Sequence, residues 1–166
     1  MTHVNLHHLA EEAVTRAVSR GLTVATAESL TAGMVAAVLA DTPGASGMLQ
    51  GGVVSYQNSV KAGVLGVSRE LLEAVGAVDG QVAKAMAEGT RRVCGADVGV
   101  STTGVAGPEP HAGKDVGSVY IGVATAEGSA AFAYSFEGSR PEIRGQACAA
   151  ALERLLEVLA PASYPE

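Results

Sequence analysis

Apolar residues recur along this chain with two different spacings, and the spacing changes near Gly95. Before it, runs with apolar positions three and four apart alternate with short, almost wholly apolar runs, a pattern typical of helices alternating with buried strands. After it, three closely spaced segments read as strands, and one long helical stripe ends the chain. The pattern predicts helices at 6–19, 31–39, 57–65, 69–75, 80–94 and 139–159 and strands at 22–27, 51–56, 97–103, 116–125 and 129–136.

The order of these segments indicates the fold class. Alternating helices and strands favour a sheet covered on both faces, and strands that follow one another closely favour antiparallel pairing. We therefore expect an α/β fold, a three-layer α/β/α sandwich on a mixed, partly antiparallel sheet. A chain of 166 residues is long enough for one well-packed domain, here residues 1–166, whereas two halves would each be of marginal size.

The charge and hydropathy of the chain argue against some classes of binding partner. The net charge is −6, only 17% of the residues are charged and no segment concentrates Lys and Arg, which argues against nucleic acid. Mean hydropathy is high, at +0.25, yet apolar runs such as 34–40 are far shorter than the ~18 residues that a membrane span needs. We therefore expect no membrane partner, and a homo-oligomer that buries part of the apolar surface between copies. The N-terminal segment lacks the features of a signal peptide, which predicts a cytoplasmic protein.

The two cysteines point to packing rather than to chemistry. Cys94 and Cys148 both fall in Ala-rich helical segments and lack the spacing of metal ligands. In a reducing compartment they are expected to be small core residues. The sequence therefore predicts no disulfide, no metal and no cofactor.

The stretch AESLTAG, residues 27–33, stands between a predicted strand and a predicted helix. Such a junction presents backbone N–H groups at a helix N-terminus, close to the hydroxyl of Ser29. Three interpretations fit this arrangement: a site for an anion, an activated serine whose oxyanion those amides hold, or a serine that only caps the helix. The pattern alone leaves all three open.

A catalytic Ser29 would need a base other than histidine. The flanking glycines of a nucleophile elbow and the S-x-x-K motif are both absent, and His111 lies in a Gly- and Pro-rich loop where a solvent-exposed role is expected. Lysine can act as the base where burial lowers its pKa. Lys84 is expected on a helix surface, and Lys114 lies in a loop that imitates a phosphate-binding P-loop without matching its spacing.

Lys61 is the remaining lysine. A predicted strand end leads into the helix that carries Asn58 and Lys61 on one face, three residues apart. Because α/β sheets gather their ligands at strand ends, this is a second polar cluster of the same kind as the one at Ser29. The alternative is a surface lysine.

Several blocks of the sequence together resemble the CinA C-terminal domain family: AESLTAG, PGAS…GGVVSYQNSVKAGVLGV, AMAEG…GAD, TTGVAGP, VGSVYIGV and a closing SRPEIR helix. The likeness spans about residues 6–159, with the blocks in the family's order and spacing. It implies the CinA-like fold. It also implies an amidohydrolase that takes a small-molecule nucleotide, nicotinamide mononucleotide, to nicotinic acid mononucleotide and ammonia in pyridine nucleotide salvage, using Ser and Lys.

The resemblance also implies roles for single residues. Ser29 matches the family's nucleophile, Lys61 its general base and Tyr56 a tyrosine of the same site, for which packing of the ring is the alternative. A guanidinium fork at a helix start suits a 5′-phosphate, which is the role expected of Arg144 unless it forms an ion pair with Glu142 or Asp115. The residues expected to line the substrate pocket are Thr31, Gly33, Asn58, Thr103 and Arg144.

Two positions depart from the family pattern. Ala32 stands where members usually have glycine, and Glu109-Pro110-His111 interrupt a loop that usually carries a run of glycines. Pro110 stiffens a segment that would otherwise be free to close over a ligand. These departures keep a second interpretation open, a non-catalytic nucleotide-binding or assembly module of the competence/damage-inducible type.

Overall fold

The computed structural model describes residues 5–161 of the chain. A short 3-10 turn, Ala45–Gly47, precedes the second strand. The helices and strands are α1 (Leu6–Arg20), β1 (Val24–Glu28), α2 (Met34–Ala40), β2 (Leu49–Val54), α3 (Asn58–Gly63), α4 (Arg69–Val75), α5 (Gly80–Cys94), β3 (Val98–Gly104), β4 (Ser118–Thr125), β5 (Gly128–Ser135) and α6 (Arg140–Leu159).

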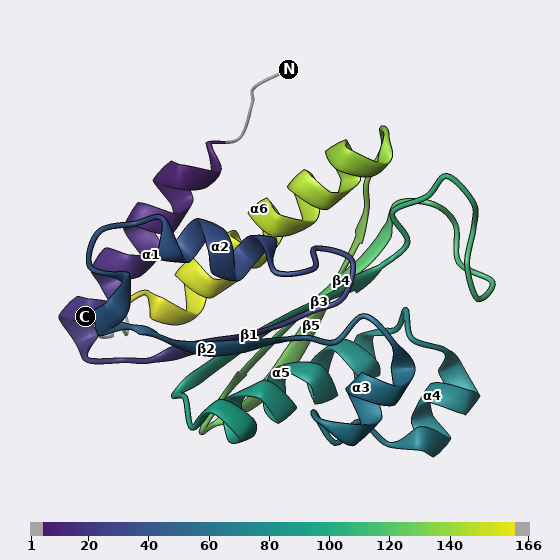
Figure 1. Ribbon diagram of the computed structural model, residues 1–166, viewed down its shortest axis with the longest axis horizontal. Coiled ribbons are helices and arrows are strands. Elements are labelled where there is room, and N and C mark those ends of the chain that lie inside the picture. The colour runs from purple at the N-terminus through teal and green to yellow at the C-terminus, as the bar shows by residue number, and fades with distance from the viewer. Residues whose placement is uncertain (1–4, 162–166) are drawn as a thin grey trace, which may run out of the picture.

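A mixed sheet forms the middle layer, with the strands in the order β2-β1-β3-β4-β5. β1 pairs in parallel with both β2 and β3, while β4 pairs antiparallel with β3 and β5. Helices α1, α2 and α6 cover one face, and α5 covers the other with α3 and α4 beside it (Figure 1). The predicted three-layer α/β/α sandwich on a partly antiparallel sheet is confirmed.

The apolar stripes of the sequence meet in two clusters. The larger one fills the space between the sheet and the layer of α1, α2 and α6, and includes Leu39, Ile121 and Leu152. The smaller one lies under α5 and the segment around Leu65. Within residues 5–161, no helix combines the length and the apolar character that crossing a bilayer requires.

Both cysteines are free thiols. Cys148 lies in the larger core, and its burial, followed by the charge of Glu28, raises the pKa of the thiol to about 12. A thiol that stays protonated at neutral pH is a poor nucleophile, so Cys148 behaves as the small core residue that the sequence predicts.

The structure corrects the predicted start of the second helix. Its first residue is Met34 rather than Thr31, and its N-cap is Gly33, with a left-handed φ of 101°. The amides of Val35 and Ala36 donate to the carboxylate of Glu28, at 2.8 and 3.1 Å. A side chain from the preceding strand therefore satisfies the helix N-terminus, and residues 29–33 form a turn.

Candidate active site

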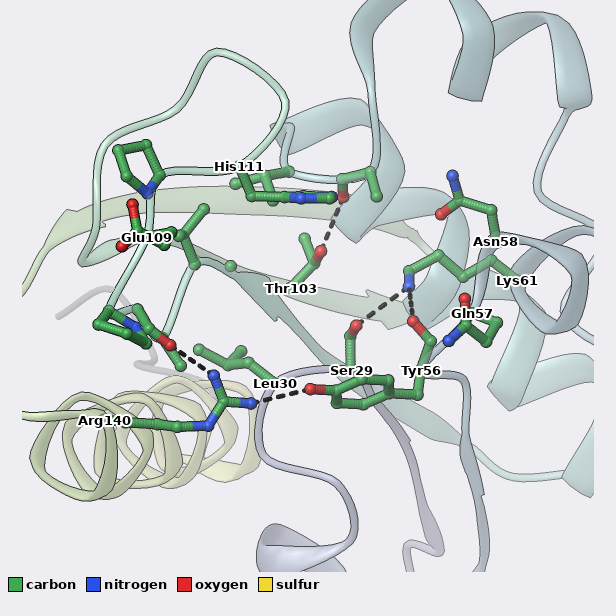
Figure 2. Close-up of a pocket in the computed structure, with 18 residues that line it drawn as sticks. Ser29, Leu30, Tyr56, Gln57, Asn58, Lys61, Thr103, Glu109, His111 and Arg140 are labelled. Atoms are coloured by element: carbon green, nitrogen blue, oxygen red, sulfur yellow. Dashed lines mark hydrogen bonds between the residues drawn. The ribbon is translucent and has the colours of Figure 1, made fainter.

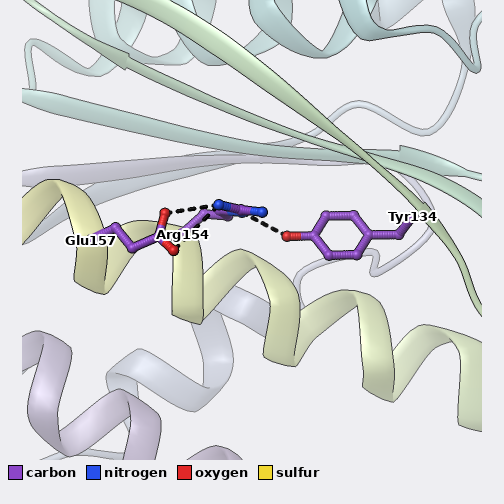
Figure 3. Close-up of polar contacts among 3 residues, drawn as sticks. All are labelled: Tyr134, Arg154 and Glu157. Carbon is purple, nitrogen blue, oxygen red and sulfur yellow. Dashed lines mark hydrogen bonds and ion pairs between the residues drawn. The ribbon is translucent and has the colours of Figure 1, made fainter.

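Ser29 and Lys61 lie at neighbouring ends of the sheet. Ser29 directly follows β1, and Lys61 lies in α3, which comes shortly after β2. Because β1 and β2 are parallel neighbours, their carboxyl ends open at the same edge. Lys61 Nζ lies 3.0 Å from Ser29 Oγ (Figure 2), so two residues far apart in sequence form a hydrogen-bonded pair.

Lys61 is a buried lysine, only 1% exposed. Its Nζ donates to the backbone carbonyls of Ser55 and Tyr56, at 2.8 and 3.1 Å, and among the described residues it forms no ion pair. Desolvation by burial lowers the pKa of Lys61 from 10.5 to about 8. A neutral amine has two N–H bonds and one lone pair. The protonated amine donates its third hydrogen to the serine hydroxyl, whereas the neutral amine, with both hydrogens given to the two carbonyls, has its lone pair left for that hydroxyl.

Ser29 does not cap a helix, since α2 begins at Met34 with Gly33 as its N-cap. The carboxylate of Glu28 occupies the anion position at this helix N-terminus, which argues against the first of the three interpretations, a ligand anion bound there. The amide of Ser29 points to β3, where it donates to the carbonyl and the hydroxyl of Thr102, at 3.0 and 3.3 Å. Of the three interpretations for this serine, the geometry favours the activated hydroxyl.

A cavity of about 500 Å³ opens beside the Ser29–Lys61 pair. The pair lies at one end of the cavity, and Arg140 and Glu109 lie at the other (Figure 2). The residues that line it are Ser29, Leu30, Tyr56, Gln57, Asn58, Lys61, Ala77, Val78, Thr103, Gly104, Val105, Ala106, Gly107, Pro108, Glu109, Pro110, His111 and Arg140.

Three more of the predicted residues line this cavity: Tyr56, Asn58 and Thr103. The hydroxyl of Thr103 donates to the carbonyl of Ala77 at 2.7 Å. The hydroxyl of Tyr56 accepts from Arg140 at 2.9 Å, and only the backbone carbonyl of Tyr56 contacts the lysine. Tyr56 thus helps to orient Lys61 through its main chain.

The structure does not bring Thr31, Gly33 and Arg144 to the cavity. Thr31 is fully buried and donates to Glu28, while Gly33 shapes the start of α2. Arg144 donates to the carbonyls of Leu30 and Thr31, at 2.8 and 3.1 Å, and forms no ion pair among the described residues. These residues hold the turn that carries Ser29.

Arg140 is a cationic cavity residue that the sequence pattern did not single out. Its guanidinium donates to the carbonyl of Gly107 at 2.6 Å and to the hydroxyl of Tyr56 (Figure 2). Arg140 and Arg144 lie one turn apart on the same face of α6, so periodicity cannot choose between them. The available signal was the capping box at Ser139, which makes Arg140 the first residue of the helix. His111 also lines the cavity, at a rim of exposed loop residues.

Comparison with known proteins gives one consistent result. The model of the CinA C-terminal domain matches residues 6–159. A CinA-like protein from Frankia casuarinae is 47% identical over 143 residues, which cover 86% of this chain and 33% of that protein. A putative competence-damage inducible protein from Bacillus pumilus is 48% identical over 139 residues, covering 84% and 33%. The chain thus spans about a third of the length of these curated relatives.

Solved structures show the same likeness over almost the whole chain. The competence/damage inducible protein CihA from Agrobacterium tumefaciens has a TM-score of 0.90 at 34% identity, covering 96% of this chain and 100% of that one. The competence damage-inducible protein A from Klebsiella pneumoniae has a TM-score of 0.92 at 30% identity, covering 96% and 99%. The arrangement of strands and helices is therefore shared with these proteins.

Proposed function

The chain belongs to the CinA C-terminal domain family, and from that premise we propose that it is an amidohydrolase that converts nicotinamide mononucleotide to nicotinic acid mononucleotide and ammonia. The observation that carries this proposal is the 3.0 Å contact between Ser29 Oγ and the buried amine of Lys61, at the end of a cavity. The proposal includes a cytoplasmic place in pyridine nucleotide salvage, no cofactor, and assembly as a homo-oligomer.

The chemistry follows from the protonation state of Lys61. In its neutral form the amine takes the proton of Ser29, and the serine oxygen adds to the carboxamide carbon of the substrate. The protonated lysine then gives that proton to the leaving nitrogen, so that ammonia departs and an ester on Ser29 remains. Water, deprotonated by Lys61, hydrolyses the ester, which releases the acid and restores the serine.

The oxyanion needs hydrogen-bond donors close to Ser29. The serine's own amide is engaged with Thr102, and the amide of Ala32 donates to the carbonyl of Ser29. Of the amides that follow the serine in this turn, we assign the oxyanion to those of Leu30 and Thr31. The side chain of Arg144 supports them, because it holds the carbonyls of the same two residues.

The far end of the cavity suits the phosphate of a mononucleotide. Arg140 presents a guanidinium there, which matches a phosphate by paired N–H donors. We therefore propose Arg140, in place of Arg144, as the phosphate contact, with Asn58 and Thr103 on the wall between phosphate and carboxamide. Thr31, Gly33 and Arg144 do not contact the substrate in this proposal. They act by shaping the turn of residues 29–33 that carries Ser29, here called the serine turn.

The test is ammonia release from nicotinamide mononucleotide by the purified protein in the presence of a chelator. Removing either half of the pair, by Ser29→Ala or Lys61→Met, is expected to lower kcat about a thousandfold or more, because each half is needed for the same proton transfer. Lys84→Met, at an exposed lysine of α5, is the control and keeps full activity. Full activity in either variant of the pair contradicts the mechanism.

A second candidate is the non-catalytic nucleotide-binding or assembly module. The departure at Glu109, Pro110 and His111 favours it, because all three residues line the cavity. Thermal unfolding with nicotinamide mononucleotide and with its acid product distinguishes the two functions. Stabilisation by either nucleotide without ammonia release supports the module.

A further inference from the structure

A chain of buried hydroxyl groups connects the backbone of Ser29 to Glu28, and apart from Ser29 its residues do not line the cavity. Glu28, Thr31 and Thr102 are each at most 1% exposed. The hydroxyl of Thr31 lies 2.7 Å from Glu28 Oε1 and 2.8 Å from the hydroxyl of Thr102. The amide of Ser29 lies 3.3 Å from Thr102 Oγ1. These contacts form one continuous path from Ser29 to the adjacent residue Glu28. The path passes through Thr31 and Thr102, which lie 71 positions apart in sequence.

The direction of every hydrogen bond in this path follows from the carboxylate. A carboxylate only accepts, so the hydroxyl of Thr31 donates its single hydrogen to Glu28. Thr31 Oγ1 is then the acceptor in its contact with Thr102, whose hydroxyl must donate. Thr102 Oγ1 is in turn left to accept from the amide of Ser29 at 3.3 Å, beside the 3.0 Å bond of the same amide to the carbonyl of Thr102. The path runs one way: Ser29 N–H to Thr102, Thr102 to Thr31, and Thr31 to Glu28.

The same carboxylate also ties separate elements to the serine turn. Glu28 ends β1 and accepts from the first amides of α2, while Thr102 belongs to β3. Among the described residues Glu28 forms no ion pair, so its charge is balanced by hydrogen-bond donors and the helix N-terminus. Since a fully satisfied buried network admits few other arrangements, this one fixes the backbone of Ser29, whose hydroxyl contacts Lys61.

We propose that Glu28 is a positioning residue for the nucleophile, acting through Thr31 and Thr102 on the backbone of Ser29. The inference rests on the proposed function in that it takes Ser29 as the nucleophile, and it holds for any acyl substrate. Its physical basis is orientation, because a displacement of about 1 Å at a reacting group lowers rates by about a hundredfold.

The test interrupts the path at its middle. Thr102→Val keeps the shape of the side chain but replaces the hydroxyl by a methyl group, which neither donates to Thr31 nor accepts from Ser29. Thr102→Ser restores the hydroxyl without the methyl group. Thr90→Val is the matched control: Thr90 is also fully buried and its hydroxyl donates to the carbonyl of Thr26 at 2.8 Å, away from the serine turn.

Two readouts are measured on each variant: the melting temperature, and the rate at which a fluorophosphonate labels Ser29, followed by intact mass. In the labelling step the serine oxygen bonds to phosphorus, fluoride leaves, and Lys61 takes the proton. We expect Thr102→Val to be labelled about tenfold or more slowly than wild type, Thr102→Ser to recover most of the rate, and Thr90→Val to match wild type within about twofold, although each valine variant removes one buried hydroxyl group and its hydrogen bonds. Glu28→Gln, which keeps the shape and removes the charge, is expected to slow labelling as well.

The outcomes separate this inference from the proposed function. If wild type is labelled at Ser29 but releases no ammonia from nicotinamide mononucleotide, the proposed substrate is wrong, and the positioning role of Glu28 can still be measured by labelling. Equal labelling of Thr102→Val, Thr90→Val and wild type overturns the positioning role and leaves the hydrolase standing. A wild-type serine that the reagent does not label overturns it too, since no reactive nucleophile would then be positioned.

Discussion

Lys61 is the residue whose titration decides when the proposed chemistry can run. Burial lowers its pKa to about 8, and only the neutral amine can take the serine proton. We expect kcat/KM to rise with pH through this region and to level off above it, because the neutral fraction grows about tenfold per pH unit below the pKa. A pH–rate profile on the wild-type protein measures this. A profile that is flat from pH 6 to 9, at about constant protein stability, contradicts a lysine base.

The same titration affects stability. Below pH 8 Lys61 is protonated in both the folded and the unfolded chain, whereas between 8 and 10.5 only the unfolded chain keeps the proton. The unfolded state then binds more protons, so the free energy of unfolding rises with pH across this window, by up to about 3 kcal/mol. Urea titrations measure this. Between pH 8 and 10 the free energy of unfolding should rise more for wild type than for Lys61→Met, whereas Lys84→Met, the control, should follow wild type.

Replacing Arg140 and replacing Arg144 should change different kinetic constants. Arg140→Ala is expected to raise KM for nicotinamide mononucleotide about tenfold or more, and to affect the phosphate-free riboside little, because a hydrogen bond to a charged group contributes about 1.5–3 kcal/mol. Arg144→Ala releases the carbonyls of the serine turn and should lower kcat for both substrates. The reverse assignment of these effects would restore the phosphate role to Arg144.

Residue roles were predictable to different degrees. Ser29 and Lys61 stand in sequence blocks that match the family. A polar cluster at two strand ends is also expected on physical grounds, because α/β sheets bind ligands at the carboxyl ends of their strands. What the pattern could not show is which functional groups remain free. Tyr56 offers its carbonyl rather than its hydroxyl to the lysine, and Arg144 is engaged by backbone carbonyls, because both outcomes depend on contacts between elements distant in sequence.

Among the elements, α5 lies unusually close to the sheet, and glycines allow it. A Cβ at Gly122 of β4 would lie 2.2 Å from the carbonyl oxygen of Ala83 and 2.5 Å from Ser101 Oγ. Gly122→Ala is therefore expected to lower the free energy of unfolding by about 2 kcal/mol or more, since helix and strand backbone must move apart. Gly145 in α6 is the matched control: a Cβ there meets nothing within 4 Å, and Gly145→Ala should stabilise by about 0.5–1 kcal/mol. Urea unfolding of both variants measures the contrast, and equal effects would contradict the close packing.

Element positions were predicted well where the apolar period was long and less well at the junctions. The predicted helix at 31–39 begins at Met34 instead, because the buried carboxylate of Glu28 satisfies the first amides, a role that a sequence pattern assigns to a Ser or Thr. The predicted strand at 51–56 is Leu49–Val54, since pairing with β1 begins at Leu49 and the chain turns after Val54 to present Ser55 and Tyr56 to the lysine.

At the scale of the whole molecule, the layers follow from the pattern but the strand order does not. The short connection between β4 and β5 predicts their antiparallel pairing, whereas the longer connection of residues 105–117 leaves the pairing of β3 with β4 to the folded chain. The parallel placement of β1 between β2 and β3 depends on which faces pack best in three dimensions. The meeting of Ser29 and Lys61 depends on that same neighbour relation, which is why it became visible only in the folded chain.

The surface beside β2 bears on assembly. β2 is an edge strand, with β1 as its one neighbour in the sheet, and Val54 on it is 52% exposed. Val18 and Val93 are also about half exposed. Val18 lies near this edge, since a Cβ at Gly47, just before β2, would lie 3.3 Å from it, and the residue after Val93 reaches the same strand, since a Cβ at Gly51 would lie 3.4 Å from the sulfur of Cys94. A strand with one open edge and exposed valines on it and on α1 is what a contact between copies would cover.

We therefore predict that two copies associate through their β2 edges about a twofold axis, and that sedimentation at micromolar concentration gives twice the 16.6 kDa of one chain. Val54→Lys should shift this mass to that of one chain, because an edge lysine opposes pairing of strands and a symmetric contact would bring the two charges together. Ala133→Lys, at an exposed position of β5 on the opposite edge, carries the same charge and should leave the dimer intact. A wild-type mass of one chain at every concentration contradicts the homo-oligomer, and a dimer that survives Val54→Lys places the contact on another face.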